Sequence, residues 1–128
     1  MPVEPVPTPS APASAGPYSP AVRAGEWLAL AGQVGIDPAT GKLAGDGVVD
    51  QTRQALANVA AVLGDCGATL SDVAKTTVFL LDMGDFPMMN EIYADAFAGH
   101  RPARSTVAVS ALPLGARVEV EVWAYVPG

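Results

Sequence analysis

The stretch RPARSTVAVSALPLGARVEVEVWAYV, residues 101–126, contains two extended segments separated by a Leu-Pro-Leu-Gly break. The first, residues 104–110, is rich in β-branched side chains, and the second, residues 117–126, alternates strictly. A period of two predicts a strand with two different faces, one of which is apolar here and requires a core. The other face carries two carboxylates and two large aromatic rings: Glu119, Glu121, Trp123 and Tyr125.

These two segments suggest a site if they pair as neighbours in a sheet. Arg104 and Thr106 would then share a face with Glu119 and Glu121. A guanidinium fork matches a carboxylate ligand in shape and charge, and a nearby glutamate can hold or activate water. Alternation alone does not fix the pairing or the register. From the residues alone, an Arg104–Glu119 ion pair that holds an interface together is the favoured interpretation, because structural ion pairs are common at interfaces.

The composition bounds the class of protein. The 128 residues are half hydrophobic and only 16% charged, which predicts one compact domain with a substantial core. No apolar run approaches the roughly 20 residues that span a bilayer, and the N-terminus lacks the pattern of a secretory signal. The single cysteine, Cys66, excludes an internal disulfide and fits a reducing cytosol. We therefore expect a cytoplasmic protein without a membrane partner.

The charge and the histidine count exclude two classes of site. A net charge of −6 disfavours general nucleic-acid binding, because phosphate affinity comes largely from Lys and Arg. One histidine and one cysteine are too few for a zinc or iron cluster, so no metal site is expected. We interpret His100 as a helix-end residue near negative carbonyls.

The first twenty residues divide into two parts. Residues 1–15 are rich in Pro, Ala and Ser, which predicts a flexible lead that does not pair regularly, followed by one domain over residues 16–128. Tyr18 lies between two prolines and is held in an extended pose. It either packs on the core or places its hydroxyl in a pocket.

Two helices are expected between the strands. The first covers residues 48–63, with Asp46 as its N-cap. The second follows Asp85, carries Pro87 in its first turn and ends near Gly99. The first helix presents a polar side that we expect to face solvent: Asp50, Arg53, Gln54 and Asn58. The remaining expected elements are strands over residues 26–32 and 73–81 and a hairpin turn over residues 37–42.

This element order predicts an α+β two-layer sandwich, a mixed β-sheet with two helices on one face. The face with Glu119, Trp123 and Tyr125 is left uncovered. Sheet faces with large aromatics usually find a partner, so we expect a homo-oligomer with sites near its interface. Gly32 either marks a close backbone approach by a ligand or belongs to a bulge.

Several motifs, in this order and spacing, resemble the RidA/YjgF family of enamine/imine deaminases. The resemblance covers about residues 16–126, and its most specific part is the Arg-Pro-Ala-Arg-Ser-Thr segment followed by the Val-Glu-Val-Glu strand. The motifs that carry it are GPYSP (16–20), GQ (32–33), QTRQALAN (51–58), KTTV (75–78), YA (93–94), RPARSTV (101–107) and VEVE (118–121).

The resemblance implies a chorismate-mutase-like fold, assembled as a homotrimer with three clefts between subunits. It implies a hydrolase of the 2-iminobutanoate/2-iminopropanoate type. Such an enzyme converts reactive 2-imino acids, or their 2-aminoacrylate-type enamine tautomers, to 2-keto acids and ammonia. It also implies that no metal or organic cofactor takes part.

The resemblance also assigns roles to residues. Arg104 would grip the substrate carboxylate, and Glu119 would position or activate the attacking water. Tyr18 would line the cleft, while the Gly32 backbone and Thr106 would contact the ligand. An imine carbon is electrophilic once its nitrogen is protonated, so orientation and one placed water suffice for the reaction.

Two departures from the family pattern bear on substrate range. The best-known deaminases have Cys where Thr106 stands and Ser where Ala31 stands. Thr106 keeps a hydrogen-bonding group, and Ala31 does not. Two other functions remain alternatives. One is a non-catalytic, chaperone-like or small-carboxylate-binding trimer. The other is an RNA-cleaving translation inhibitor, against which the acidic charge counts.

Overall fold

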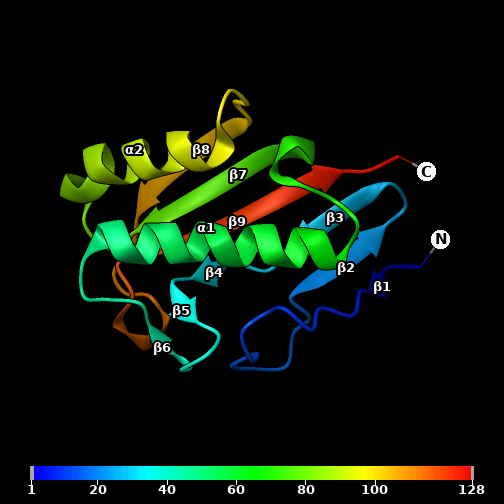
Figure 1. Ribbon diagram of the computed structural model, residues 1–128, viewed down its shortest axis with the longest axis horizontal. Helices are drawn as coiled ribbons and strands as arrows, with labels where there is room; N and C mark the ends of the chain where they lie inside the picture. The colour runs from blue at the N-terminus through cyan, green and yellow to red at the C-terminus, as the bar shows by residue number, and fades with distance from the viewer. Residues whose placement is uncertain (1, 128) are drawn as a thin grey trace.

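The computed structural model describes residues 2–127, and within them a seven-stranded sheet carries both helices on one side (Figure 1). The strand order is β1-β2-β3-β9-β7-β8, and the short β4 pairs with β9 beyond the end of β3. The strands of this sheet are β1 (Glu4–Pro5), β2 (Ala21–Ala24), β3 (Trp27–Leu30), β4 (Gln33–Val34), β7 (Val73–Leu80), β8 (Ala103–Ala108) and β9 (Val118–Tyr125).

Two α-helices, a small hairpin and three 3-10 turns complete the fold. Their bounds are β5 (Ile36–Asp37), β6 (Lys42–Leu43), α1 (Val48–Asp65), η1 (Leu70–Asp72), η2 (Met83–Asp85), α2 (Phe86–Phe97) and η3 (Pro113–Gly115). β5 and β6 pair antiparallel around the predicted turn. The sheet is mixed, because β7 and β8 run parallel and the other pairs run antiparallel. The predicted α+β class, mixed sheet and two helices on one face are confirmed.

The expected pairing of the two C-terminal strands is wrong. β7 lies between β8 and β9, and its Thr76 is aligned with Arg104 on one side and Val122 on the other. Because α2 connects β7 to β8, the chain returns in the same direction and β8 joins the sheet edge parallel to β7. Arg104 therefore projects to the side covered by the helices, whereas Glu119 projects to the open side.

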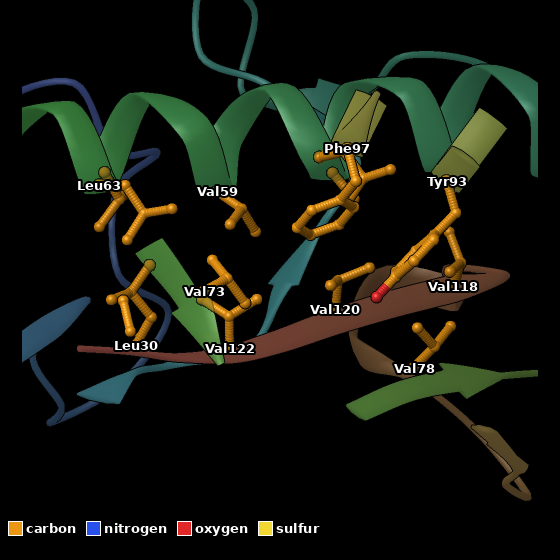
Figure 2. Packing of buried hydrophobic residues seen from close by; sticks show 14 of the residues in the cluster. Leu30, Val59, Leu63, Val73, Val78, Tyr93, Phe97, Val118, Val120 and Val122 are labelled. Carbon is orange, nitrogen blue, oxygen red and sulfur yellow. The ribbon is translucent and has the colours of Figure 1, made fainter. Parts of the chain in front are cut away.

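The core fills the space between the helices and the sheet, and Figure 2 shows its packing. Val59 and Leu63 of α1 point toward Val122 of β9, which is fully buried. From α2, Tyr93 and Phe97 pack onto the same layer. Each fully buried Val or Leu side chain stabilises the fold by about 1.5–3 kcal/mol relative to its exposed state.

The helix ends differ from the expectation in one place. Gly47, and not Asp46, is the N-cap of α1, and no side chain bonds to the free backbone N–H groups there. Asp85 does occupy the N-cap position of α2, but its carboxylate accepts hydrogen bonds from Arg117 instead of capping the helix. Gly67 follows α1 with a φ of +77°, a conformation that glycine adopts without strain.

Asn58 does not face solvent as predicted, because it is 2% exposed. Its amide nitrogen donates to the carbonyl oxygens of Val34 and Ile36, at 3.2 and 2.8 Å. Gln51, two turns earlier, also lies on the buried side and accepts from Arg117 N at 2.8 Å. Two buried amides of α1 thus satisfy backbone groups of β4, β5 and the start of β9.

The N-terminal segment contains a pairing that its prolines did not predict. Glu4 and Pro5 form β1 and align with Arg23 and Val22 of β2. Pro5 is compatible with this position because β1 is an edge strand. Further along, the Ser10 backbone N–H and hydroxyl both donate to the Asp65 carboxylate at the end of α1, at 2.9 and 2.8 Å.

Candidate functional site

Glu119 lies half-buried on the open face of the sheet, at the wall of a pocket of about 400 Å³. Tyr18 and Gly32 line the same pocket. The Gly32 backbone is so close to the Glu119 side chain that a Cβ on Gly32 would collide with its carboxylate. Glycine at position 32 therefore lets the carboxylate of Glu119 lie against the backbone of the β3–β4 connection.

The environment of Glu119 makes its carboxylate more basic than usual. Burial raises the pKa of Glu119, and the negative charge of Glu121, two residues along the same face of β9, raises that pKa further. A carboxylate of raised pKa that opens onto a pocket is a suitable proton acceptor for water.

The rest of this pocket is largely apolar. The β3–β4 side contributes Ala31 and Val34, and the turn before β9 contributes Leu114. Leu114 is exposed and has a φ of 60°, a left-handed conformation that costs a non-glycine residue about 1–3 kcal/mol. Residues 13, 15 and 16, from the N-terminal segment, also line this pocket.

Arg104 lines a different pocket, of about 460 Å³, against α2. Its Nη2 donates to Asn90 Oδ1 at 2.7 Å, and its Cζ lies 4.7 Å from the ring centre of Tyr93 and 5.4 Å from that of Phe86. These contacts hold the guanidinium by cation–π attraction and one hydrogen bond. The ion pairs within residues 2–127 join Arg53 to Asp50 and Arg117 to Asp85. Arg104 is in neither pair, so its charge is available to an anion.

The structure separates the predicted site residues into two groups. Tyr18, Gly32 and Glu119 lie together in the first pocket. Arg104 and Thr106 project from β8 to the helix side, where Thr106 is aligned with the buried Val78. The expectation that Arg104, Thr106 and Glu119 share one sheet face within the chain is wrong, because β7 intervenes and sets the orientation of β8.

Two residues near Arg104 escaped the sequence analysis as site residues. They are Asn90 and Tyr93, and neither is among the site residues that the sequence predicts. Tyr93 does pack in the core, where its hydroxyl lies 2.8 Å from Thr76 Oγ1, but its ring also contacts Arg104. The signal was present in the helical spacing: Asn90 follows Phe86 by four residues and precedes Tyr93 by three, so all three share one face of α2.

The open face also carries exposed aromatic side chains beyond the Glu119 pocket. Trp27 and Tyr125 pack edge to face with ring centres 5.1 Å apart, and Trp123 is exposed on the same side. Next to them Lys75 donates to Ser105 across the β7–β8 pair. Together these three exposed rings form an aromatic patch on the open face of the sheet.

No group of three His, Cys, Asp or Glu side chains between residues 2 and 127 is placed to hold a metal ion. None of the helices in this range is both long enough and apolar enough to cross a bilayer.

Comparisons with known proteins agree with the motifs. The family model described as Endoribonuclease L-PSP matches residues 8–126. A RutC family protein of Pyrococcus horikoshii is 49% identical over 118 residues, which are 92% of this chain and 94% of that protein. The 2-iminobutanoate/2-iminopropanoate deaminase of Mus musculus is 48% identical over 114 residues, 89% of this chain and 84% of that protein.

A solved structure shows the same fold. The Yersinia pestis protein YyfA, described as a member of the conserved Rid protein family, superposes with a TM-score of 0.93 at 46% identity, over 97% of this chain and 99% of that one. The match of the family model over nearly the whole chain, together with these identities, shows that the protein belongs to the Endoribonuclease L-PSP family, which is the RidA/YjgF family that its motifs resemble.

Proposed function

We propose that the protein hydrolyses 2-imino acids, and their 2-aminoacrylate-type enamine tautomers, to 2-keto acids and ammonia. The observation that carries the proposal is the Glu119 carboxylate, which has a raised pKa and opens onto a pocket beside Tyr18 and Gly32. A Mus musculus relative that is 48% identical bears the name of an imine deaminase, which supports the same reaction.

The reaction requires one placed base and a fixed substrate. Glu119 accepts a proton from water while the water oxygen bonds to the iminium carbon, and the C=N π electrons move to nitrogen. The tetrahedral product then breaks its C–N bond as Glu119 returns the proton to nitrogen, and the departing ammonia takes up the proton that the hydroxyl oxygen releases. One 2-iminium acid and one water thus give one 2-keto acid and one ammonium ion. Orientation supplies most of the rate, because the iminium carbon is already electrophilic.

Arg104 is the group best suited to hold the substrate carboxylate. Its guanidinium is fixed by Asn90 and Tyr93, and it has no carboxylate partner among residues 2–127. A bidentate pair with a ligand carboxylate would fix the plane of the substrate as well as its position.

Arg104 and Glu119 lie on opposite faces of one sheet, so a single chain does not bring them to one substrate. We infer a homotrimer in which each cleft takes Tyr18, Gly32 and Glu119 from one subunit and Arg104 and Thr106 from the next. The exposed aromatic residues of the open face support such an assembly, since a face of this composition is normally covered. Cys66 is free in the structure, which fits the cytoplasm as the compartment.

The RNA-cleaving alternative has little support from the charge distribution. Arg117 is paired with Asp85 at 2.8 Å, which leaves Arg101 beside Arg104 as the only arginine that lines the same pocket among the described residues. Two arginines on a chain of net charge −6 make a small basic patch for a polyanion.

The test couples an amino-acid oxidase, which generates 2-imino acids in place, to a semicarbazide trap for residual imine. We expect the wild type to accelerate imine loss and Arg104→Ala to abolish the acceleration. Arg53→Ala, which removes a surface arginine of α1, is the matched control and should behave as the wild type. If the intact wild-type assembly gives only the uncatalysed rate, the deaminase proposal is wrong. The cleft would then be a carboxylate-binding site.

A further inference from the structure

The apolar end of the Glu119 pocket has no part in the proposed reaction. In the proposed reaction, Glu119 activates the water that attacks the imine carbon, and Arg104 binds the substrate carboxylate. The substrate side chain remains, and it needs a place in the cleft. Two turns that are far apart in the sequence form the apolar end: the segment with Ala13 and Ala15, and η3 with Leu114.

Leu114 is unusual in both its exposure and its backbone. It is 63% exposed, the highest value among the large exposed hydrophobic residues of the described chain. Its φ of 60° and ψ of 18° lie in the left-handed region that leucine rarely adopts. The turn is closed by Ala116 N, which donates to the Pro113 carbonyl at 3.0 Å. A strained apolar residue that contributes nothing to the core, and that lines a pocket, fits a ligand contact better than a packing role.

The N-terminal segment contributes two small side chains to the pocket, those of Ala13 and Ala15. The two hydrogen bonds from Ser10 to Asp65 fix this segment to the end of α1, three residues before Ala13. Because both side chains are single methyl groups, they leave room in the pocket that Leu114 also lines. The volume of about 400 Å³ lies within the range of about 300–1,000 Å³ that small-molecule sites occupy, and it admits more than a methyl-sized side chain.

We propose that Leu114 is the residue that selects the substrate side chain, so that the enzyme prefers 2-imino acids with apolar, leucine-sized side chains over those with charged ones. The inference rests on the proposed deaminase function. An apolar side chain gains by burial between Leu114 and the two alanines. A carboxylate side chain in the same place would lose its water without a hydrogen-bonding partner and would lie in the pocket that already contains Glu119.

The test compares imines generated from leucine, alanine and glutamate, each expressed as enhancement over its uncatalysed hydrolysis. Leu114→Asn keeps the approximate size, tolerates the left-handed backbone and makes the contact polar. We expect this variant to lower kcat/KM for the leucine-derived imine about 10-fold, mainly by raising KM. The value of kcat/KM for the alanine-derived imine should change far less. Leu81→Asn, the same change at an exposed leucine outside the pocket, is the control. The proposal would be overturned if the wild type enhanced the hydrolysis of all three imines equally. It would also be overturned if Leu114→Asn left kcat/KM for the leucine-derived imine unchanged.

Product binding separates this inference from the function on which it rests. Calorimetric titration with 4-methyl-2-oxopentanoate and with pyruvate reports the subsite without turnover. We expect the first to bind about 10-fold more tightly than the second to the wild type, and the difference to vanish in Leu114→Asn. If this binding difference is found but no imine is hydrolysed, the Leu114 subsite is supported and the deaminase function is wrong. If imines are hydrolysed but the two keto acids bind equally well, the deaminase function is supported and the Leu114 subsite is wrong.

Discussion

The Glu119 pocket and the Arg104 pocket are opposite in almost every respect. The first is apolar, contains one carboxylate of raised pKa and lies on the open face of the sheet. The second contains two arginines, Asn90 and Tyr93, and it lies on the helix side. One offers a proton acceptor without a counter-ion, and the other offers a cation without a counter-ion.

This difference shows why neither pocket is sufficient for the proposed chemistry. A 2-imino acid carries a carboxylate next to an electrophilic carbon, so it needs a cation and a base within one small molecule's length. Each pocket supplies one of the two groups. The separation of these groups by the thickness of the sheet is the strongest argument for a cleft shared between subunits.

The largest expected effect comes from removing the base. Glu119→Gln keeps the shape of the side chain but accepts no proton, so we expect kcat/KM for 2-imino acids to fall about 10²–10⁴-fold. Substrate or product affinity should change little, because Arg104 still binds the carboxylate. The oxidase-coupled assay and keto-acid titration measure the two quantities. A variant that keeps more than a tenth of the activity would show that Glu119 is not the base.

The same substitution should stabilise the protein at neutral pH. Since the pKa of Glu119 is raised above the usual 4.5, ionising it costs more in the folded chain than in the unfolded chain. This cost is absent at pH values below about 4.5, grows as the pH rises and is complete above the folded pKa. Thermal unfolding should therefore give a higher Tm for Glu119→Gln than for the wild type at pH 7, and equal values near pH 3.5. A lower Tm at pH 7 would contradict the assigned burial cost.

A smaller but specific loss is expected from Gly32→Ala. The added Cβ would collide with the Glu119 carboxylate, which must rotate away from its position in the pocket. We expect kcat/KM to fall about 10- to 100-fold, in line with a misplaced catalytic group. Gly47→Ala is the matched control, because no atom lies within 4 Å of a Cβ at that site. Equal activities of the two variants would show that glycine at position 32 is not needed to position the Glu119 carboxylate.

The smallest effect concerns the pH profile. Glu121 raises the pKa of Glu119, and activity requires the ionised form of Glu119, so kcat/KM should rise with pH through that pKa. Glu121→Gln removes one negative charge and should move the rising limb to lower pH, with an unchanged plateau. If the rise of kcat/KM with pH stays at the same pH in Glu121→Gln, measured at constant ionic strength, burial alone sets the pKa of Glu119.

Much of the fold could be predicted because it depends on local patterns. The alternation in residues 117–126 matches β9, and the strongly β-prone segment over residues 73–81 matches β7. The helical stripes place α1 and α2 correctly, since a face that packs on a sheet must repeat every three or four residues. The buried Asn58 was missed because it was grouped by polarity, although its spacing from Ala55 and Val62 puts it on the buried face.

The site was harder to predict because it depends on strand order. Residues 104–110 and 117–126 are close in sequence, which favoured direct pairing of the two strands. No local sequence pattern indicates that β7 lies between them in the sheet. One inserted strand and the parallel return through α2 decide that Arg104 faces the helices. The apolar role of Leu114 was also out of reach, because it depends on the meeting of η3 with the N-terminal segment.

The central claim is that each active site takes Arg104 from one subunit and Glu119 from the next. The most direct test coexpresses Arg104→Ala and Glu119→Gln subunits with different tags and purifies the mixed assemblies, each parent being inactive alone. In a cyclic trimer every mixed assembly has one intact cleft out of three, so the purified mixed trimers should show about a third of the wild-type activity. If both residues serve one site within a single chain, no mixed assembly contains an intact site. Mixed trimers as inactive as their parents would therefore contradict the account.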